Sequence, residues 1–245
     1  CVRRGGRLIR ACAGSDPVAA SDSTLRARLA VHATRLATVV PLHPSPAPRS
    51  DAGAAVLSAL DDRRTRLANA LDALCAQAGE LGEAATLIIE ALRAGGRVLI
   101  AGNGGSAAEA QHFAAELVGR FQRERDAYAA IALTADTAIL TAVANDYGYE
   151  EVFARQVVAY GQRGDVLVAF STSGESENLV RAARTAIQRG LAVVAITGRR
   201  PNRLAKVADL AIRVPVVETP LAQELHTVVL HVLCDLVESS LAAPG

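Results

Sequence analysis

The feature that most constrains the fold of this chain is a series of short runs that are apolar at every position, separated by stretches with helical spacing. A strand that is apolar on both faces needs cover on both faces, which is typical of parallel sheets with crossover helices. The pattern predicts an α/β fold, a doubly wound five-stranded parallel sheet. The predicted strands lie near 97–101, 129–133, 166–170, 192–197 and 210–214, and the predicted helices at 106–119, 149–160, 177–189 and 221–241.

A helical pattern precedes the first strand. Between 52 and 94, leucine and alanine residues recur at spacings of three, four and seven, as on the apolar face of an amphipathic helix. We expect one or two N-terminal helices here, arranged as a helical hairpin. They come before the first strand, so they cannot be a crossover within the sheet, and such a hairpin often supplies an oligomer interface.

The first fifty residues have a composition of their own. They contain eight arginines, no lysine and two aspartates, a formal charge of +6, with four prolines between 41 and 48. Proline clusters without apolar periodicity are typical of flexible chain. We predict a disordered Arg/Pro-rich tail at 1–50 and a folded domain at 51–245. The acid-poor composition of the tail also resembles an organelle transit peptide, which leaves that alternative open.

Composition argues against several classes of protein. A formal net charge of +1 gives no general attraction to nucleic acid or anionic membranes, and 3% aromatic residues leave little for base stacking. The longest apolar runs are far shorter than the roughly 18 residues of a membrane-spanning helix. The four cysteines show no paired spacing, which fits a reducing cytoplasm. We expect a cytoplasmic protein that binds neither nucleic acid nor a membrane.

Two loops follow predicted strands and precede predicted helices: Gly-Asn-Gly-Gly-Ser at 102–106 and Ser-Thr-Ser-Gly-Glu-Ser at 171–176. Ligands of such sheets bind beyond the carboxyl ends of the strands, where helix N-termini expose free N–H groups. Glycines also serve sterically at tight turns, and one hydroxyl caps a helix, but four hydroxyls exceed that need. Neither loop matches a dinucleotide or P-loop motif. The loops favour a phosphorylated small molecule over a nucleotide.

His112 and Glu116 stand four residues apart on the predicted helix 106–119, so both side chains project from one face. Such a pair is common on solvated helix surfaces and is by itself a weak signal. The motifs around this pair make it a stronger sign of a functional site. These are Ala-Gly-Asn-Gly-Gly-Ser at 101–106, Gln-His-Phe-Ala-Ala-Glu-Leu at 111–117, Ala-Asn-Asp at 144–146, Ser-Thr-Ser-Gly at 171–174 and Gln-Glu-Leu-His at 223–226.

With these motifs in this order, the chain resembles the sedoheptulose-7-phosphate isomerases, also called phosphoheptose isomerases, a family of sugar isomerase (SIS) domain proteins. The resemblance covers roughly residues 55–240. It implies an aldose–ketose isomerase that converts sedoheptulose 7-phosphate to D-glycero-D-manno-heptose 7-phosphate by enediol proton transfer. This reaction is the first step of nucleotide-activated heptose biosynthesis. The resemblance also implies a homotetramer with active sites at the subunit interfaces.

The resemblance assigns roles to individual residues. It implies one zinc ion per active site, bound by His112, Glu116, Gln223 and His231, with Glu116 and His231 as the catalytic acid/base pair. His226 is expected to pack near the site without binding the metal. Contacts to the phosphorylated sugar are implied for Asn103, Gly104, Gly105, Ser106, Arg120, Asn145, Asp146, Ser171, Thr172, Ser173, Ser176 and Gln223. Asn145 and Asp146 are also ordinary turn residues, so a turn is the alternative reading there.

The implied metal ligands raise a question of geometry. Gln223 and His231 are eight residues apart, which is about 12 Å along one helix. Either Gln223 leans inward from a frayed helix start, or the ligands come from different subunits. Glutamine is also an unusual zinc ligand, because zinc sites in proteins use Cys, His and carboxylates.

The chain departs from the family pattern at two places. Leu221-Ala222 replaces the usual Arg-Ile before the Gln-Glu pair, and 198–202 replaces a turn rich in Asp and Gly, so substrate identity and affinity stay open. The main alternative is a non-catalytic SIS-domain tetramer that binds the replication initiator protein. Retention of both Glu116 and His231 favours the enzyme. A sugar-phosphate-sensing regulator would be expected to add a helix-turn-helix, and 1–50 shows no such pattern.

Overall fold

The computed structural model describes residues 49–242, with side chains from residue 51 onward. The predicted tail at 1–50 therefore lies almost wholly outside the described residues. The chain divides into two units between Ala55 and Val56, and the second unit contains the sheet. Within 49–242, no helix combines the length and the apolar character that crossing a bilayer requires.

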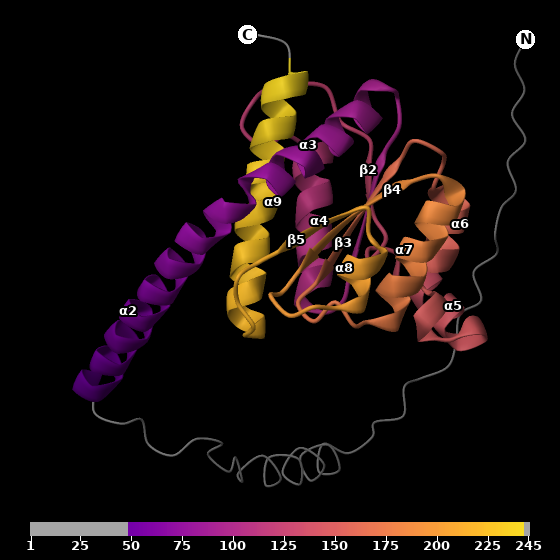
Figure 1. Cartoon of the computed structure of the whole chain (residues 1–245). Coiled ribbons are helices and arrows are strands. Elements are labelled where there is room, and N and C mark those ends of the chain that lie inside the picture. Colours follow the sequence, from indigo (N-terminus) through magenta and orange to yellow (C-terminus); the bar gives the residue numbers. More distant parts are fainter. Residues whose placement is uncertain (1–48, 243–245) are drawn as a thin grey trace, which may run out of the picture. The chain divides into compact units, whose positions relative to one another are not determined.

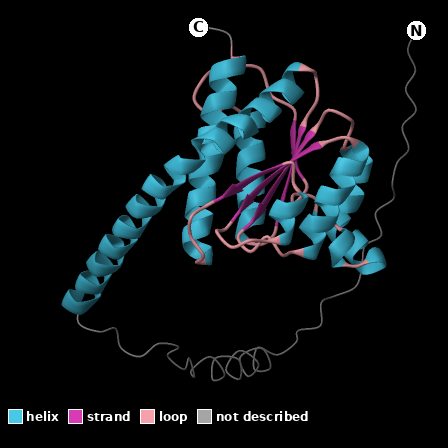
Figure 2. Ribbon diagram, viewed as in Figure 1, coloured by secondary structure: helices cyan, strands magenta, loops and turns pink. Residues whose placement is uncertain are grey.

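Five parallel strands form one sheet in the order β2-β1-β3-β4-β5, which Figure 2 shows between two layers of helices. They are β1 (Val98–Gly102), β2 (Ala130–Ala132), β3 (Val166–Ser171), β4 (Ala192–Thr197) and β5 (Leu210–Arg213). The predicted parallel sheet is confirmed. Because the chain places β2 on one side of β1 and β3 on the other, the strand order reverses between β1 and β3. Their carboxyl ends are the position where such sheets bind ligands.

Alternate strand residues face two separate apolar cores, which confirms the doubly wound arrangement. Val98 and Ile100 of β1 face a core shared with α3 (Ala78–Arg93), α4 (Gly105–Val118) and α9 (Thr219–Leu241). Leu99 and Ala101 face a second core on the other side of the sheet. Figure 1 shows α3, α4 and α9 on one face. The other face carries α5 (Thr137–Tyr147), α6 (Ala154–Tyr160), α7 (Glu177–Arg189) and α8 (Arg203–Val207).

Two of these helices were not predicted. The first is α5, which begins after Asp136, whose carboxylate accepts a hydrogen bond from the backbone N–H of Ile139 at 2.9 Å. The second is the short α8, where Asn202 caps the N-terminus by accepting from the N–H of Ala205. The helix predicted at 149–160 is instead a 3-10 turn at Tyr149–Glu151 followed by α6.

The N-terminal helices do not form the predicted hairpin. They are α2 (Arg49–Leu74) and α3, joined by a 3-10 turn at Cys75–Gln77. Leu74 and Ala78 both keep right-handed helical dihedral angles, so the chain continues forward and does not reverse (Figure 1). Gln77 fixes the junction to β5, because its side chain donates to the carbonyl of Arg213 (2.6 Å) and accepts from the N–H of the same residue (2.8 Å).

Candidate active site

The two predicted ligand loops meet at the reversal point of the sheet. β1 and β3 are neighbours, so the loops that follow them, 102–106 and 171–176, lie side by side. Asn103 and Asn178 join the loops, because each side-chain amide donates to the other at 2.9 Å. The hydroxyl of Tyr149 also donates to Asn103 (3.0 Å). This pairing ties together the carboxyl ends of β1 and β3, where the sequence predicts a ligand.

Gly105 lies against Gln223 of α9. A Cβ atom at this position would overlap the side-chain amide of Gln223, whose flexible end would then have to move away. Gly104 adopts a φ of 57°, which favours glycine. Gln223 therefore covers the N-terminal end of α4, where the resemblance implies substrate contact.

The hydroxyl groups of loop 171–176 divide into two kinds. Ser171 is buried, and its Oγ accepts from the N–H of Gly174 (3.0 Å), while Oγ of Ser173 accepts from the N–H of Glu175 (3.2 Å). These bonds shape the loop. Ser176 is the N-cap residue of α7 but its side chain makes no capping bond. A cavity of about 300 Å³ opens beside the loop and is lined by Thr172, Ser173, Glu175, Arg199, Arg200, Pro201, Val217 and Thr219.

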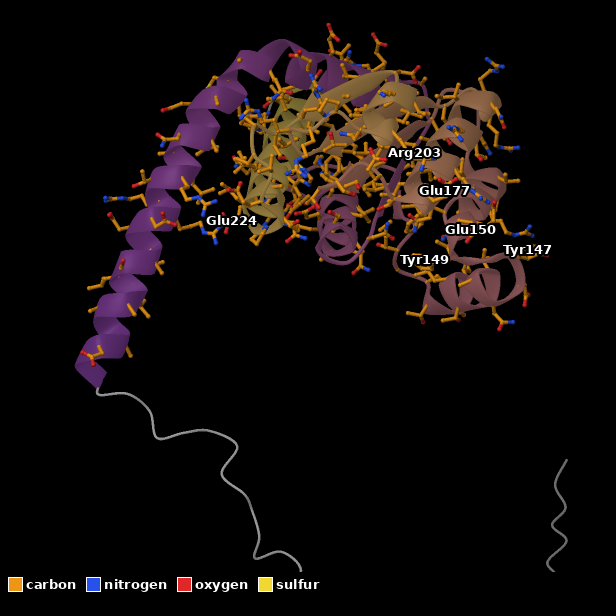
Figure 3. All side chains as sticks on the ribbon, turned by 60° about the horizontal axis from the view of Figure 1, so that its bottom comes forward. Tyr147, Tyr149, Glu150, Glu177, Arg203 and Glu224 are labelled. Atoms are coloured by element: carbon orange, nitrogen blue, oxygen red, sulfur yellow. The ribbon has the colours of Figure 1, made fainter. Side chains whose placement is uncertain are left out.

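Part of this edge is held by exposed ion pairs. Glu177, the first residue of α7, accepts from Arg181 (2.9 Å) and from Arg203 of α8 (2.7 Å). Figure 3 shows Glu177 and Arg203 lying close together. Hydrogen bonds from Arg181 and then from Arg203 lower the pKa of Glu177. The carboxylate therefore ties α7 to α8 next to the cavity.

Three side chains converge on one point of the facing helices α4 and α9. Nε2 of His112 lies 3.1 Å from Oε1 of Glu116 and 3.4 Å from Nε2 of His231. One ligand atom from each residue lies within 4.8 Å of the others, and all three side chains are partly exposed. Two ring nitrogens that face each other at 3.4 Å can share at most one proton between them. Two imidazoles and a carboxylate are also a common zinc-binding set, so the residues fit a metal ion.

Gln223 is not part of this cluster. It lies in the second turn of a continuous α9 and contacts Gly105, seven residues before His112 and therefore about 10 Å along α4. A frayed start of α9 does not occur, so that explanation for Gln223 as a ligand does not apply. His112, Glu116 and His231 converge without it.

Of the remaining predicted residues, Ser106 is buried in the first turn of α4, and the others lie on exposed segments. The guanidinium of Arg120 pairs with Glu124 (3.6 Å) rather than with Glu116. Asn145 and Asp146 are exposed in the last turn of α5, not in a turn, and the amide of Asn145 donates to Oδ1 of Asp146 (2.8 Å). The end of α5 lies near the first loop, because Tyr149 follows directly and bonds Asn103 (Figure 3).

His231 is held by an aromatic contact that the sequence did not indicate. The ring of Phe121 stacks on the imidazole, with centroids 5.3 Å apart and planes 27° apart. Phe121 begins a loop that is fixed by Glu238 of α9. The carboxylate accepts from the N–H groups of Phe121, Gln122 and Arg123 and from the side chain of Arg125.

Cys234 lies near the cluster but does not extend its chemistry. Burial is the main cause that raises the pKa of this thiol to about 12, and the nearby Glu116 adds to the effect. The thiol therefore stays protonated near neutral pH, where a thiolate would be needed for nucleophilic attack or for metal binding.

Four side chains near the site were not singled out from the sequence: Glu109, Phe121, Tyr149 and Asn178. Only Glu109 had a visible signal, because it shares a helical face with His112 and Glu116 at spacings of three and four. The other three reach the site through tertiary contacts that have no local pattern.

Comparison with known proteins agrees with this geometry. A family model described as SIS domain matches residues 64–198. The phosphoheptose isomerase of Rhodospirillum rubrum is 51% identical over 169 residues, which cover 69% of this chain and 89% of that protein. The structure of phosphoheptose isomerase from Neisseria gonorrhoeae matches with a TM-score of 0.71 at 39% identity, over 75% of this chain and 99% of that chain.

A phosphoheptose isomerase structure from Francisella tularensis matches with a TM-score of 0.68 at 35% identity, over 79% of this chain and 100% of that chain. The family model spans more than half of this chain, and the relatives are matched over nearly their whole length. The chain thus belongs to the phosphoheptose isomerase family of SIS-domain enzymes.

Proposed function

We propose that this chain converts sedoheptulose 7-phosphate to D-glycero-D-manno-heptose 7-phosphate in the cytoplasm, as the first step of nucleotide-activated heptose biosynthesis. The observation that carries the proposal is the convergence of His112, Glu116 and His231 on facing helices, of which α4 begins at one of two loops suited to a phosphorylated sugar. Membership of the family supplies the substrate class.

The reaction requires proton transfers that this cluster is suited to perform. A base removes a proton from C1 of the ketose to give an enediol, and a proton is then delivered to C2. In parallel, O1 loses a proton and O2 gains one. We assign the transfer of the carbon-bound proton from C1 to C2 to one of the two residues Glu116 and His231. The other residue transfers the proton from O1 to O2. Stacking of Phe121 limits the orientations open to the imidazole of His231.

The same three residues are the proposed ligands of one zinc ion. Two histidines and one carboxylate match the donor types that zinc prefers, and they leave room for a further ligand. A bound zinc ion would polarise the substrate carbonyl and so lower the cost of removing the C1 proton. Gln223 contacts Gly105 in its own chain, so a role for it as a ligand would call for a subunit interface.

The phosphate is proposed to lie at loop 171–176. The cavity there combines hydroxyls of Thr172 and Ser173 with two arginines, Arg199 and Arg200. These arginines stand in the turn that departs from the family pattern, and Arg199 also borders Leu221 in an adjacent cavity. They supply positive charge near the position where the usual arginine is missing.

The test of the function is turnover of sedoheptulose 7-phosphate by the purified chain, followed by proton NMR. We expect the aldoheptose 7-phosphate to appear, the rate to fall at least about tenfold after chelation, and zinc to restore it. Sedoheptulose without its phosphate should lose at least about 100-fold in kcat/KM, because remote binding energy is spent on the chemical step. Binding of the sugar phosphate without turnover would contradict the isomerase and favour the initiator-binding scaffold.

We also propose a homotetramer with the active sites at subunit interfaces. Leu57 and Leu60 of α2 are 70% and 61% exposed, and a cavity of about 340 Å³ beside His231 is lined by apolar side chains of α9. Light scattering should give a mass of about four times 25.5 kDa. The double variant Leu57→Glu with Leu60→Glu should have a lower mass, whereas Val158→Glu on α6 should keep the mass of the wild type. A monomeric wild-type chain would refute the assembly.

A further inference from the structure

The interface between α4 and α9 contains polar side chains on successive turns. The two helices pack against each other and run in the same direction, side by side in Figure 1. Four residues of α4, at steps of four, three and four, lie near four residues of α9 in the same order. The pairs are Gly105 with Gln223, Glu109 with His226, His112 with His231, and Glu116 with Cys234, and the second and third of them bring polar side chains within 3.4 Å of each other.

The second of these pairs lies in the core. The imidazole of His226 is fully buried and Glu109 is 7% exposed, with Nδ1 of His226 3.4 Å from Oε2 of Glu109. Among the described residues, this oxygen and both ring nitrogens have no hydrogen-bond partner. The ring of Phe170 lies 5.9 Å away on the sheet side. The imidazole is therefore enclosed, and Oε2 of Glu109 is a polar atom close to its Nδ1.

Stability alone does not account for such a pair. Removing a carboxylate and an imidazole from water costs several kcal/mol, and well-packed apolar residues in their place are often as stable or more stable. The neighbouring residues on both helices, such as Phe113 and Leu230, are already apolar and buried. A buried polar pair at this position calls for another explanation.

Fixing the register of two helices is the best-attested role of a buried polar contact between them. Apolar contacts have no direction, so they resist sliding and rotation only weakly. A carboxylate and an imidazole can meet in one register only. The next layer along the helices is His112 with His231, one turn away, where ligand atoms must converge to within about 0.5 Å of their working positions.

We propose that Glu109 and His226 are positioning residues that fix the register of α4 against α9, and thereby bring His112 and Glu116 to His231. Neither residue touches the substrate or the metal. The role of the pair toward the metal rests on the proposed zinc site, whereas its role in fixing the register does not. Glu109 acts through α4, which carries two members of the cluster, and His226 acts through α9, which carries the third.

The decisive variant replaces both residues by apolar ones, Glu109→Leu with His226→Leu. We expect an unchanged or higher free energy of unfolding in urea, because no buried charge is left without a partner. The Kd for zinc, measured by competition with a chromophoric chelator, should rise about 10- to 100-fold. Amide hydrogen exchange in α4 and α9 should speed up without loss of global stability. The exchanged pair, Glu109→His with His226→Glu, should recover part of the zinc affinity.

Asp165→Asn is the matched control. Asp165 is another buried carboxylate, but it lies at the amino edge of the sheet, where it accepts from the N–H groups of Arg97 and Gln162. This variant should lose stability and keep the wild-type zinc affinity. If the doubly apolar variant keeps the wild-type zinc affinity and the wild-type rates of amide hydrogen exchange in α4 and α9, the pair does not fix the register of the two helices. If the wild-type chain binds no zinc, the metal site fails, and hydrogen exchange in α4 and α9 still decides the register role.

Discussion

Glu116→Gln and His231→Ala are each expected to lower kcat by about 10²- to 10⁴-fold, the usual contribution of a positioned acid or base, in a chain that stays folded. Both side chains lie at the partly exposed rim of the α4–α9 interface, so their removal leaves the apolar core intact. Initial rates should be measured at saturating zinc and at several substrate concentrations. Circular dichroism and light scattering should then match the wild type.

Glu124→Gln is the matched control for these variants. Glu124 is 92% exposed and lies eight residues after Glu116 in the adjacent loop. The substitution therefore removes one negative charge near the cluster without changing a residue of the cluster. Its kcat should stay at the wild-type value. A wild-type kcat in Glu116→Gln or in His231→Ala would show that the substituted residue takes no part in the proton transfers. Loss of folding or of assembly would assign the residue to the structure instead.

The sheet was predictable because its signal is local. Each strand, such as β3, is apolar over most of its length, and this pattern depends only on burial of both faces of a parallel sheet. The helix α5 was missed for a related reason. None of its residues is buried, so no buried apolar face marks a helix there. Only the N-cap at Asp136 marks its beginning.

The site was predictable where its residues share one helix. His112 and Glu116 are four residues apart, and their proximity follows from helix geometry. Their approach to His231, 119 positions away, rests on the packing of α4 against α9 and was implied only by the resemblance. Contacts of Phe121 with His231 and of Asn103 with Asn178 depend on loop conformations, which no spacing in the sequence encodes.

Glu238→Ala is expected to destabilise the chain by about 3–5 kcal/mol, because it leaves the charge of Arg125 buried without a counter-ion. The two side chains are 2% and 3% exposed, with Nε of Arg125 3.0 Å from Oε1 of Glu238. Three backbone N–H groups also lose their acceptor. At roughly 2–4 °C for each kcal/mol, Tm should fall by about 6–20 °C in calorimetry.

The control for this loss is Glu224, which lies on the same helix as Glu238 and forms an exposed ion pair with Arg63 of α2. These side chains are about 40% exposed, and Nη1 of Arg63 lies 3.4 Å from Oε2 of Glu224, so Glu224→Ala should cost less than about 1 kcal/mol. Equal losses of unfolding free energy in the two variants would show that burial does not make the pair of Glu238 with Arg125 more stabilising than an exposed pair.

The stability contributed by Glu238 should depend on pH in one direction. Burial by itself would raise the pKa of this carboxyl, but hydrogen bonds from the three backbone N–H groups, together with the charge of Arg125, outweigh burial and lower it. A lowered pKa means that the contribution is complete above the ordinary value of about 4.3 and is lost as the pH falls through the lowered value. The difference in unfolding free energy between the wild type and Glu238→Gln should therefore be constant near neutral pH and shrink only in acid. A difference that already shrinks between pH 7 and pH 5 would mean that the carboxyl titrates above its ordinary range, and that the backbone N–H groups do not hold it ionised.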